Sequence, residues 1–234
     1  MKIINREISW LSFNERVLQE AEDPRVPLVQ RMRFLGIFSN NLDEFFRVRV
    51  ATVQRVINFG KSAREVIGGK PKKILKQIHN KVVEQHKRFN AAFHDILKEL
   101  EKENIHVIQD FHKLNKTQME FVRSYFRREV RPALVPIMVD GPEDFPYLRD
   151  KSIYLAVKFI RKKGSSQPRY SLIEIPADVV GRFLVLPQRG ERKCIILLDD
   201  IIRAGLDEIF AIFDYKDIEA YTIKITRDAE LDID

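Results

Sequence analysis

Residues 31–49 read RMRFLGIFSNNLDEFFRVR, and this stretch decides how the first half of the chain is organised. It lies within a run from about Pro27 to Phe59 whose composition and spacing predict a helix. The middle of the run, Gly36 to Asn41, contains weak helix formers and side chains that compete for backbone hydrogen bonds. We therefore expect the helix to be broken or distorted near Ser39 to Asn41.

The same stretch offers candidate binding chemistry. The amides of Asn40 and Asn41 each provide donors and an acceptor, which suits a base edge or a hydroxyl-rich ligand. Arg47 and Arg49 carry forked donors that reach phosphate oxygens. A structural alternative is that these residues cap a broken helix, whose second half would open with acidic residues at its positive end. Both interpretations stay open on the residues alone.

Helices are also expected on either side of this stretch. Trp10, Phe13, Val17 and Ala21 recur at spacings of three and four, which places them on one face of a helix. Its start is expected at Ser12, which has capping-box spacing to Glu15, or one turn earlier at Ser9. After a basic loop at residues 60–70, a long amphipathic helix is predicted from Pro71 to about Glu103. Residues 1–103 are therefore expected to form an all-helical domain.

The second half of the chain has a different pattern. Short runs rich in β-branched and aromatic residues predict strands at Ile105–Ile108, Ser152–Ile160, Tyr170–Ile175, Phe183–Leu186, Cys194–Leu197 and Ala220–Thr226. The second and third of these are expected to form a hairpin with a long loop. A capping box at Thr117–Glu120 predicts a helix that ends near Arg131, and Asp199–Phe210 is also expected to be helical. The fold class is thus α+β, with a helical domain at 1–103 and a mixed domain at 104–234.

Composition limits the class of protein. The 234 residues are 44% hydrophobic and include one cysteine, which excludes a disordered tail and a disulfide scaffold. No run approaches the roughly 18 to 20 apolar residues of a membrane span, and the N-terminus lacks the apolar core of a signal peptide. A cytoplasmic protein without a transmembrane segment is expected.

The net charge of +7 is confined to one half of the chain. Residues 1–103 hold 20 basic and 13 acidic residues, whereas residues 104–234 hold 21 of each. This asymmetry indicates an anionic partner for the helical half, such as a nucleotide, polyphosphate or nucleic acid. A solvated helical surface with surplus lysine is the simpler explanation.

Local motifs do not identify catalytic residues or a metal site. Gly60-Lys61-Ser62 resembles the end of a phosphate-binding loop, but Arg55 stands where that motif requires glycine. His79, His86 and His94 share a helix face at intervals of about 10 to 12 Å, too far apart to bind one metal ion. Cys194 lies in an apolar run and is expected to be a buried strand residue.

A family resemblance adds what the patterns leave open. Residues 5–21 (NREISWLSFNERVLQEA), the segment at 33–49 and residues 226–230 (TRDAE) resemble the N-terminal part of polyphosphate kinases that work through a phosphohistidine. The resemblance implies reversible transfer of the terminal phosphoryl group of ATP to polyphosphate, with Mg²⁺. It implies that the helical domain forms a wall of the ATP site and that the second, head domain supports a homodimer or higher oligomer. By position in the Ser-Asn-Asn-Leu-Asp-Glu-Phe motif, Asn41 corresponds to the family's ATP-contacting asparagine.

The catalytic groups of the family do not fall within these residues. Its reacting histidines and the residues that hold phosphate and metal belong to C-terminal catalytic domains, which the resemblance places after Asp234. None of the five histidines here occupies such a motif, so we expect residues 1–234 alone to be inactive, with Mg²⁺ ligands outside this chain. Two alternatives remain: a basic module that binds polyanions or RNA, and a purely structural oligomerisation module.

Overall fold

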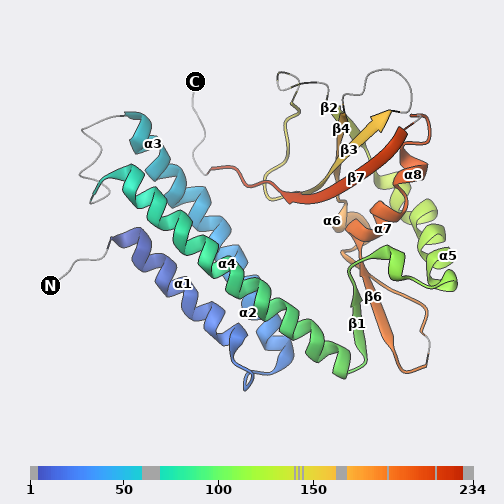
Figure 1. Ribbon diagram of the computed structural model, residues 1–234, viewed down its shortest axis with the longest axis horizontal. Helices are drawn as coiled ribbons and strands as arrows, with labels where there is room; N and C mark the ends of the chain where they lie inside the picture. Colours follow the sequence, from blue (N-terminus) through green and yellow to red (C-terminus); the bar gives the residue numbers. More distant parts are fainter. Residues whose placement is uncertain are drawn as a thin grey trace. The chain divides into compact units, whose positions relative to one another are not determined.

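The computed structural model describes residues 5–59, 69–139, 141, 143, 145–161, 168–188, 190–213 and 215–228 (Figure 1). These residues form two compact units. The second unit is Glu103–Thr226, and the first comprises the described residues up to Lys102 together with Arg227 and Asp228. We expected residues after Thr226 to belong to the second domain, but Asp228 forms an ion pair with Arg55 of the first unit at 3.4 Å.

The first unit is helical, as predicted. Its elements are α1 (Arg6–Glu22), α2 (Leu28–Glu44), the π-helix η1 (Phe45–Val50), α3 (Ala51–Phe59) and α4 (Pro71–Lys102). Helices α1, α2 and α4 run side by side and enclose one apolar core (Figure 1). Residues 60–68 of the predicted basic loop lie outside the described residues.

The predicted break at Ser39–Asn41 is wrong. Helix α2 continues through these residues to Glu44, and the irregular segment is the π-helix that follows it. The buried side chains of Phe38, Leu42 and Phe45 hold the helix against its neighbours, and Phe45 stacks on Trp10 with ring centroids 4.7 Å apart. Tertiary packing therefore outweighs the weak helix propensity of the intervening residues.

Helix α1 also differs from its prediction. It begins at Arg6, where Asn5 caps it by accepting a hydrogen bond from the backbone N–H of Glu7. Ser9 and Ser12 both lie inside the helix, so neither is the cap. The buried positions are Glu7, Leu11, Asn14, Leu18 and Ala21, whereas Phe13 is 67% exposed. Two polar residues on the buried face concealed its periodicity.

The second unit contains two sheets. The smaller has strand order β1 (Ile105–Ile108), β6 (Lys193–Leu197) and β5 (Phe183–Val185), with β1 parallel to β6. The larger is antiparallel, with order β2 (Pro136–Val139), β4 (Arg169–Glu174), β3 (Ile153–Arg161) and β7 (Tyr215–Lys224). The helical elements of this unit are η3 (Phe111–Lys113), α5 (Lys116–Tyr125), η4 (Phe126–Val130), η5 (Arg131–Ala133), α6 (Ala177–Val180), α7 (Leu198–Ala204) and α8 (Leu206–Ile209).

All six predicted strands are present, including the β3–β4 hairpin, whose loop residues 162–167 lie outside the described residues. Strand β2 was missed because it starts with Pro136, and proline within a run weakens a strand prediction. Its position at the edge of the sheet tolerates the proline. The capping box of α5 is formed by Asn115 and Gln118, two residues before the predicted one. Within the described part of the chain, no helix has both the length and the apolar content required to cross a membrane.

Candidate functional site

The side chain of Asn41 is fixed by a relay of two amides between α1 and α2. Asn41 Nδ2 donates to Asn14 Oδ1 at 3.0 Å, and Asn14 Nδ2 donates to the backbone carbonyl of Phe38 at 3.2 Å. Asn14 is fully buried, whereas Asn41 is only partly buried.

The relay determines which end of each amide faces inward. A backbone carbonyl only accepts, so the NH₂ group of Asn14 must face Phe38 and its oxygen must face Asn41. It follows that Asn41 directs its NH₂ group to Asn14 and keeps its own Oδ1 out of that bond. The neighbouring Asn40 is exposed to solvent and takes no part in the relay.

Asn41 therefore has two hydrogen-bonding groups beyond those the relay uses: the Oδ1 acceptor and the second N–H of Nδ2. Adjacent donor and acceptor groups of this kind match the base edge of adenine, which presents an amine donor beside a ring-nitrogen acceptor. The sequence pattern pointed to amide chemistry at residues 40 and 41. The relay distinguishes the two residues, because only Asn41 is held in a single orientation.

Arg49 of η1 also contacts α1. Its Nη1 lies 3.2 Å from Glu7 Oε2, and the Glu7 side chain is only 3% exposed. Arg6 contacts the other carboxylate oxygen of Glu7, with its Nη2 at 3.0 Å from Oε1. Glu7 and Asn14 are two turns apart on α1, about 10 Å along the helix axis. The structure thus brings both Asn41 and Arg49 onto α1, at separate points.

Arg47 is placed differently. Its Nη1 lies 3.7 Å from Glu44 Oε2, in the preceding turn of the same helical segment, and its side chain is 28% exposed. Its Nε atom is buried, and no hydrogen-bond partner for it is found among the described residues. Arg47 is therefore not joined to Asn41 or Arg49 through α1.

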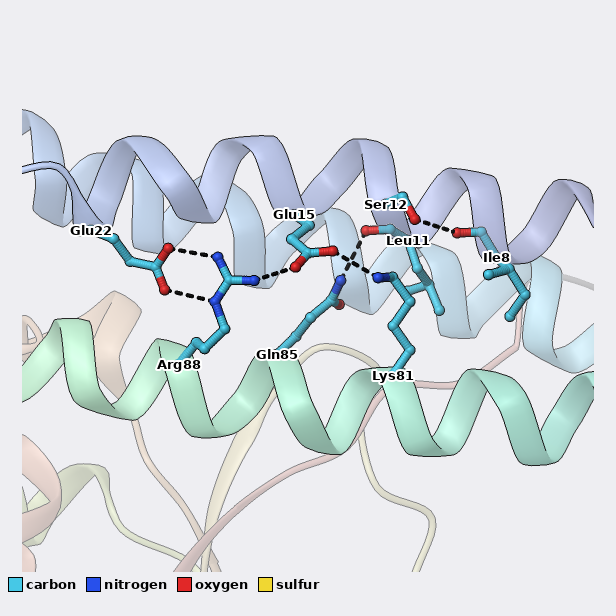
Figure 2. Close-up of polar contacts among 8 residues, drawn as sticks. All are labelled: Ile8, Leu11, Ser12, Glu15, Glu22, Lys81, Gln85 and Arg88. Atoms are coloured by element: carbon cyan, nitrogen blue, oxygen red, sulfur yellow. Dashed lines mark hydrogen bonds and ion pairs between the residues drawn. The ribbon is translucent and has the colours of Figure 1, made fainter. Parts of the chain in front are cut away.

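A separate charge network links α1 to α4, and sequence reasoning missed it. Glu15 accepts from Lys81 Nζ at 2.7 Å and also from Arg88, and Arg88 donates two further bonds to Glu22 at 2.8 and 2.6 Å (Figure 2). Between these ion pairs the buried Gln85 donates to the backbone carbonyl of Leu11 at 2.9 Å (Figure 2). The detectable signal was the matched spacing of seven residues between the two acids and between the two bases, which puts each pair on one helix face.

The network is electrostatically balanced. Burial raises the pKa of the Glu15 carboxyl, but the hydrogen bond and charge of Lys81, together with Arg88, outweigh burial and hold that pKa below its usual range. The two carboxylates raise the pKa of Arg88 further above its already high value. These charges are mutually satisfied, which favours a structural role for the network.

The second unit buries two adjacent carboxylates in the first turn of α7. Asp199 accepts from Thr222 at 2.9 Å and lies 3.0 Å from Arg182, while Asp200 accepts from Arg203 at 2.7 Å. Burial, reinforced by the charge of Asp199 and opposed by Arg203, raises the pKa of Asp200 to about 6. In the described ranges, no three His, Cys, Asp or Glu side chains are grouped so that they could hold a metal ion.

Comparison with known proteins gives consistent matches along nearly the whole chain. The model of the polyphosphate kinase N-terminal domain matches residues 3–108, and that of the polyphosphate kinase middle domain matches residues 117–234. Polyphosphate kinases of Vibrio parahaemolyticus and Escherichia coli K12 are 44% and 42% identical to this chain, each over 98% of its length. The crystal structure of polyphosphate kinase from Porphyromonas gingivalis superposes with a TM-score of 0.85 at 34% identity over 99% of this chain. The chain spans about a third of each of these proteins, namely 33% of the two relatives and 34% of the crystallised chain.

Proposed function

This chain belongs to the polyphosphate kinase family, and we propose from this that it supplies the adenine-binding wall and an oligomerisation surface of an ATP:polyphosphate phosphotransferase. The phosphoryl group of ATP would pass to the polymer through a histidine outside residues 1–234. Residues 1–234 alone are then expected to form no polymer from ATP.

The observation that carries the nucleotide proposal is the amide relay at Asn41. Asn41 Oδ1 accepts from the exocyclic amine of adenine, and the free N–H of Nδ2 donates to the neighbouring ring nitrogen. Asn14 is a positioning residue, because its bond to Phe38 sets the orientation of Asn41. A preoriented amide loses little conformational freedom on binding, which favours affinity.

Arg49 extends the proposed site toward the phosphates. Its guanidinium carries five donors, so the contact with Glu7 leaves others for a phosphate oxygen. Arg47 is a second candidate, with its exposed portion available to an anion. The Mg²⁺ that the resemblance implies would be held by residues outside this chain. Among the described residues, no three His, Cys, Asp or Glu side chains are grouped as metal ligands.

Replacing Asn41 with alanine tests the nucleotide proposal in a full-length family enzyme that contains this chain. We expect the KM for ATP to rise about 5- to 30-fold, because one hydrogen-bonded amide contributes about 1 to 2 kcal/mol. Asn40→Ala is the matched control and should leave KM unchanged, since Asn40 lies outside the relay. Equal KM values for Asn41→Ala and the unmodified enzyme would remove Asn41 from the site.

The proposed oligomer surface rests on an edge strand of the second unit. Strand β5 lies at one end of its sheet and exposes Phe183 at 65% and Val185 at 60%, and the nearby Val179 is 74% exposed. Exposed apolar side chains beside an unpaired strand edge are suited to pairing with a second copy. Light scattering should therefore detect a dimer or larger assembly that Phe183→Asp dissociates. A monomer at all concentrations before substitution would refute this role.

A further inference from the structure

A cavity of about 440 Å³ lies in the second unit, beside the parallel strands β1 and β6. His106 and Cys194, which are paired across these strands, both line it. Side chains paired in register lie on the same face of a sheet, so the two residues form part of one wall. The volume lies within the range of about 300 to 1,000 Å³ that is typical of small-molecule sites.

The charge around this cavity is not balanced. Lys113 and Arg192 line it, and neither has an ion-pair partner among the residues that the structure describes. Other arginines of this unit do pair with carboxylates, for example Arg127 with Glu208 at 2.9 Å. No acidic side chain occurs among the described lining residues. Uncompensated positive charge in a concave site concentrates anions.

The start of helix α5 adds to this positive field. The N-cap Asn115 and the residue Gln118 both line the cavity, so the positive end of the helix dipole lies beside it. Gln118 is 7% exposed, and its Oε1 accepts from the backbone N–H of Asn115. That bond leaves the NH₂ group of Gln118 as a further donor.

We infer that this cavity binds a phosphate-bearing anion. Arg192 supplies forked donors, Lys113 supplies a point charge, and Gln118 and His106 supply hydrogen-bonding groups in the wall. The inference rests on the proposed function only for the choice of phosphate among anions. A polyphosphate chain and the phosphates of a nucleotide share this chemistry, and the test separates them.

Cys194 provides a direct readout, because it is the only cysteine of the chain and it lines the cavity. Its rate of alkylation by uncharged N-ethylmaleimide is measured on the 234-residue chain with tripolyphosphate, ATP or adenosine, at matched ionic strength. Tripolyphosphate, ATP or both should slow the reaction, and adenosine should not. Protection by tripolyphosphate assigns the polymer as a ligand, and protection by ATP alone assigns the nucleotide phosphates. No protection by either compound, or equal protection by adenosine, would overturn the inference.

Arg192→Gln and Lys113→Gln should each raise the ligand concentration needed for half-protection by about tenfold or more, since a hydrogen bond to a charged group is lost. Lys193→Gln is the matched control, because Lys193 is exposed between Arg192 and Cys194 and strand alternation directs its side chain to the opposite face. The control should shift protection less than about twofold. An equal shift in all three variants would indicate diffuse attraction and overturn the site.

Asn41→Ala keeps the two proposals separable. It should leave protection of Cys194 unchanged, because Asn41 belongs to the other compact unit. Protection that depends on Arg192, combined with an unchanged KM for ATP in Asn41→Ala, would refute the adenine site and retain the cavity. A raised KM for ATP in Asn41→Ala, combined with no protection of Cys194 that depends on Arg192, would refute the cavity and retain the adenine site.

Discussion

The pKa values of two carboxyl groups, one partly buried in the first unit and one buried in the second, shift in opposite directions. In the first unit, Glu15 lies between Lys81 and Arg88, and its pKa is held below the usual range. In the second unit, Asp200 lies beside another buried carboxylate, and burial raises its pKa to about 6. A carboxyl group therefore contributes to the stability of the first unit when it is charged, at Glu15, and to that of the second unit when it is protonated, at Asp200.

Within the first unit, two polar networks differ in whether all of their hydrogen-bonding groups are used, and this separates a structural network from a candidate binding group. The α1–α4 network is closed, since its acids and bases satisfy one another (Figure 2). The Asn14–Asn41 relay is open, because it ends in an amide whose Oδ1 the relay does not use. An open relay on a partly buried residue is suited to a ligand, whereas a closed network is suited to holding helices together.

The chain carries its own probes for this comparison. Trp10 is the only tryptophan and belongs to the first unit, whereas all six tyrosines lie in the second. Tryptophan fluorescence therefore reports unfolding of the helical unit, and near-ultraviolet tyrosine absorbance reports unfolding of the other unit.

The largest expected effect comes from removing Arg88. Arg88→Ala leaves Glu15 and Glu22 without a shared cation in a partly buried interface, which should lower the free energy of unfolding of the first unit by about 2 kcal/mol. Denaturant titration followed by tryptophan fluorescence measures it.

Lys98→Ala is the control for this substitution. Its ion pair with Asp95 is exposed on the same helix, so the loss should stay below about 0.5 kcal/mol. Equal losses for the two variants would show that the α1–α4 network contributes no more than a surface ion pair.

A smaller effect of opposite sign is expected from Asp200→Asn. Because the pKa of Asp200 is raised in the folded state from about 3.8 to about 6, folding of the second unit binds a proton, and its stability falls as pH rises through this interval. A neutral asparagine side chain at this position carries no charge to bury and can still accept from Arg203. The substitution should therefore stabilise this unit at pH 7 by on the order of 1 to 2 kcal/mol and have little effect below about pH 4.

Tyrosine-monitored unfolding at pH 4 and pH 7 tests this sign. The first unit provides an internal comparison, because the lowered pKa of Glu15 contributes stability above its ordinary value of 4.5 that is lost as pH falls. Destabilisation of Asp200→Asn at pH 7 would contradict the assignment.

The sequence was sufficient for most elements, although not for β2 or α6, and insufficient for their faces. Periodicity and capping signals found the longer helices, and β-branched and aromatic runs found six of the seven strands. It misassigned the buried face of α1 because Asn14 and Glu7 occupy core positions that pattern reasoning reserves for apolar residues. It placed the helical irregularity at Ser39–Asn41 because propensity does not include the packing of Phe38 and Phe45.

The candidate site was also predictable only in part, because sequence patterns do not include contacts between residues far apart in the chain. Two adjacent asparagines indicated amide chemistry, and the family resemblance singled out Asn41. The bond to Asn14 joins residues 27 positions apart, so only the folded chain reveals which amide is oriented and how. Arg47 and Arg49 were grouped by sequence, but the fold pairs them with different acids, Glu44 and Glu7.

The proposed contact between the fixed amide of Asn41 and the adenine base should make the enzyme selective for ATP over other nucleotides. Guanine presents a carbonyl oxygen where adenine presents an amine, so the Oδ1 of Asn41 should favour ATP over GTP. In a full-length family enzyme that contains this chain, the ratio of kcat/KM for ATP to that for GTP should fall about 5- to 30-fold in Asn41→Ala and stay unchanged in Asn40→Ala. An unchanged ratio in Asn41→Ala, with both nucleotides affected equally, would contradict adenine recognition by this residue.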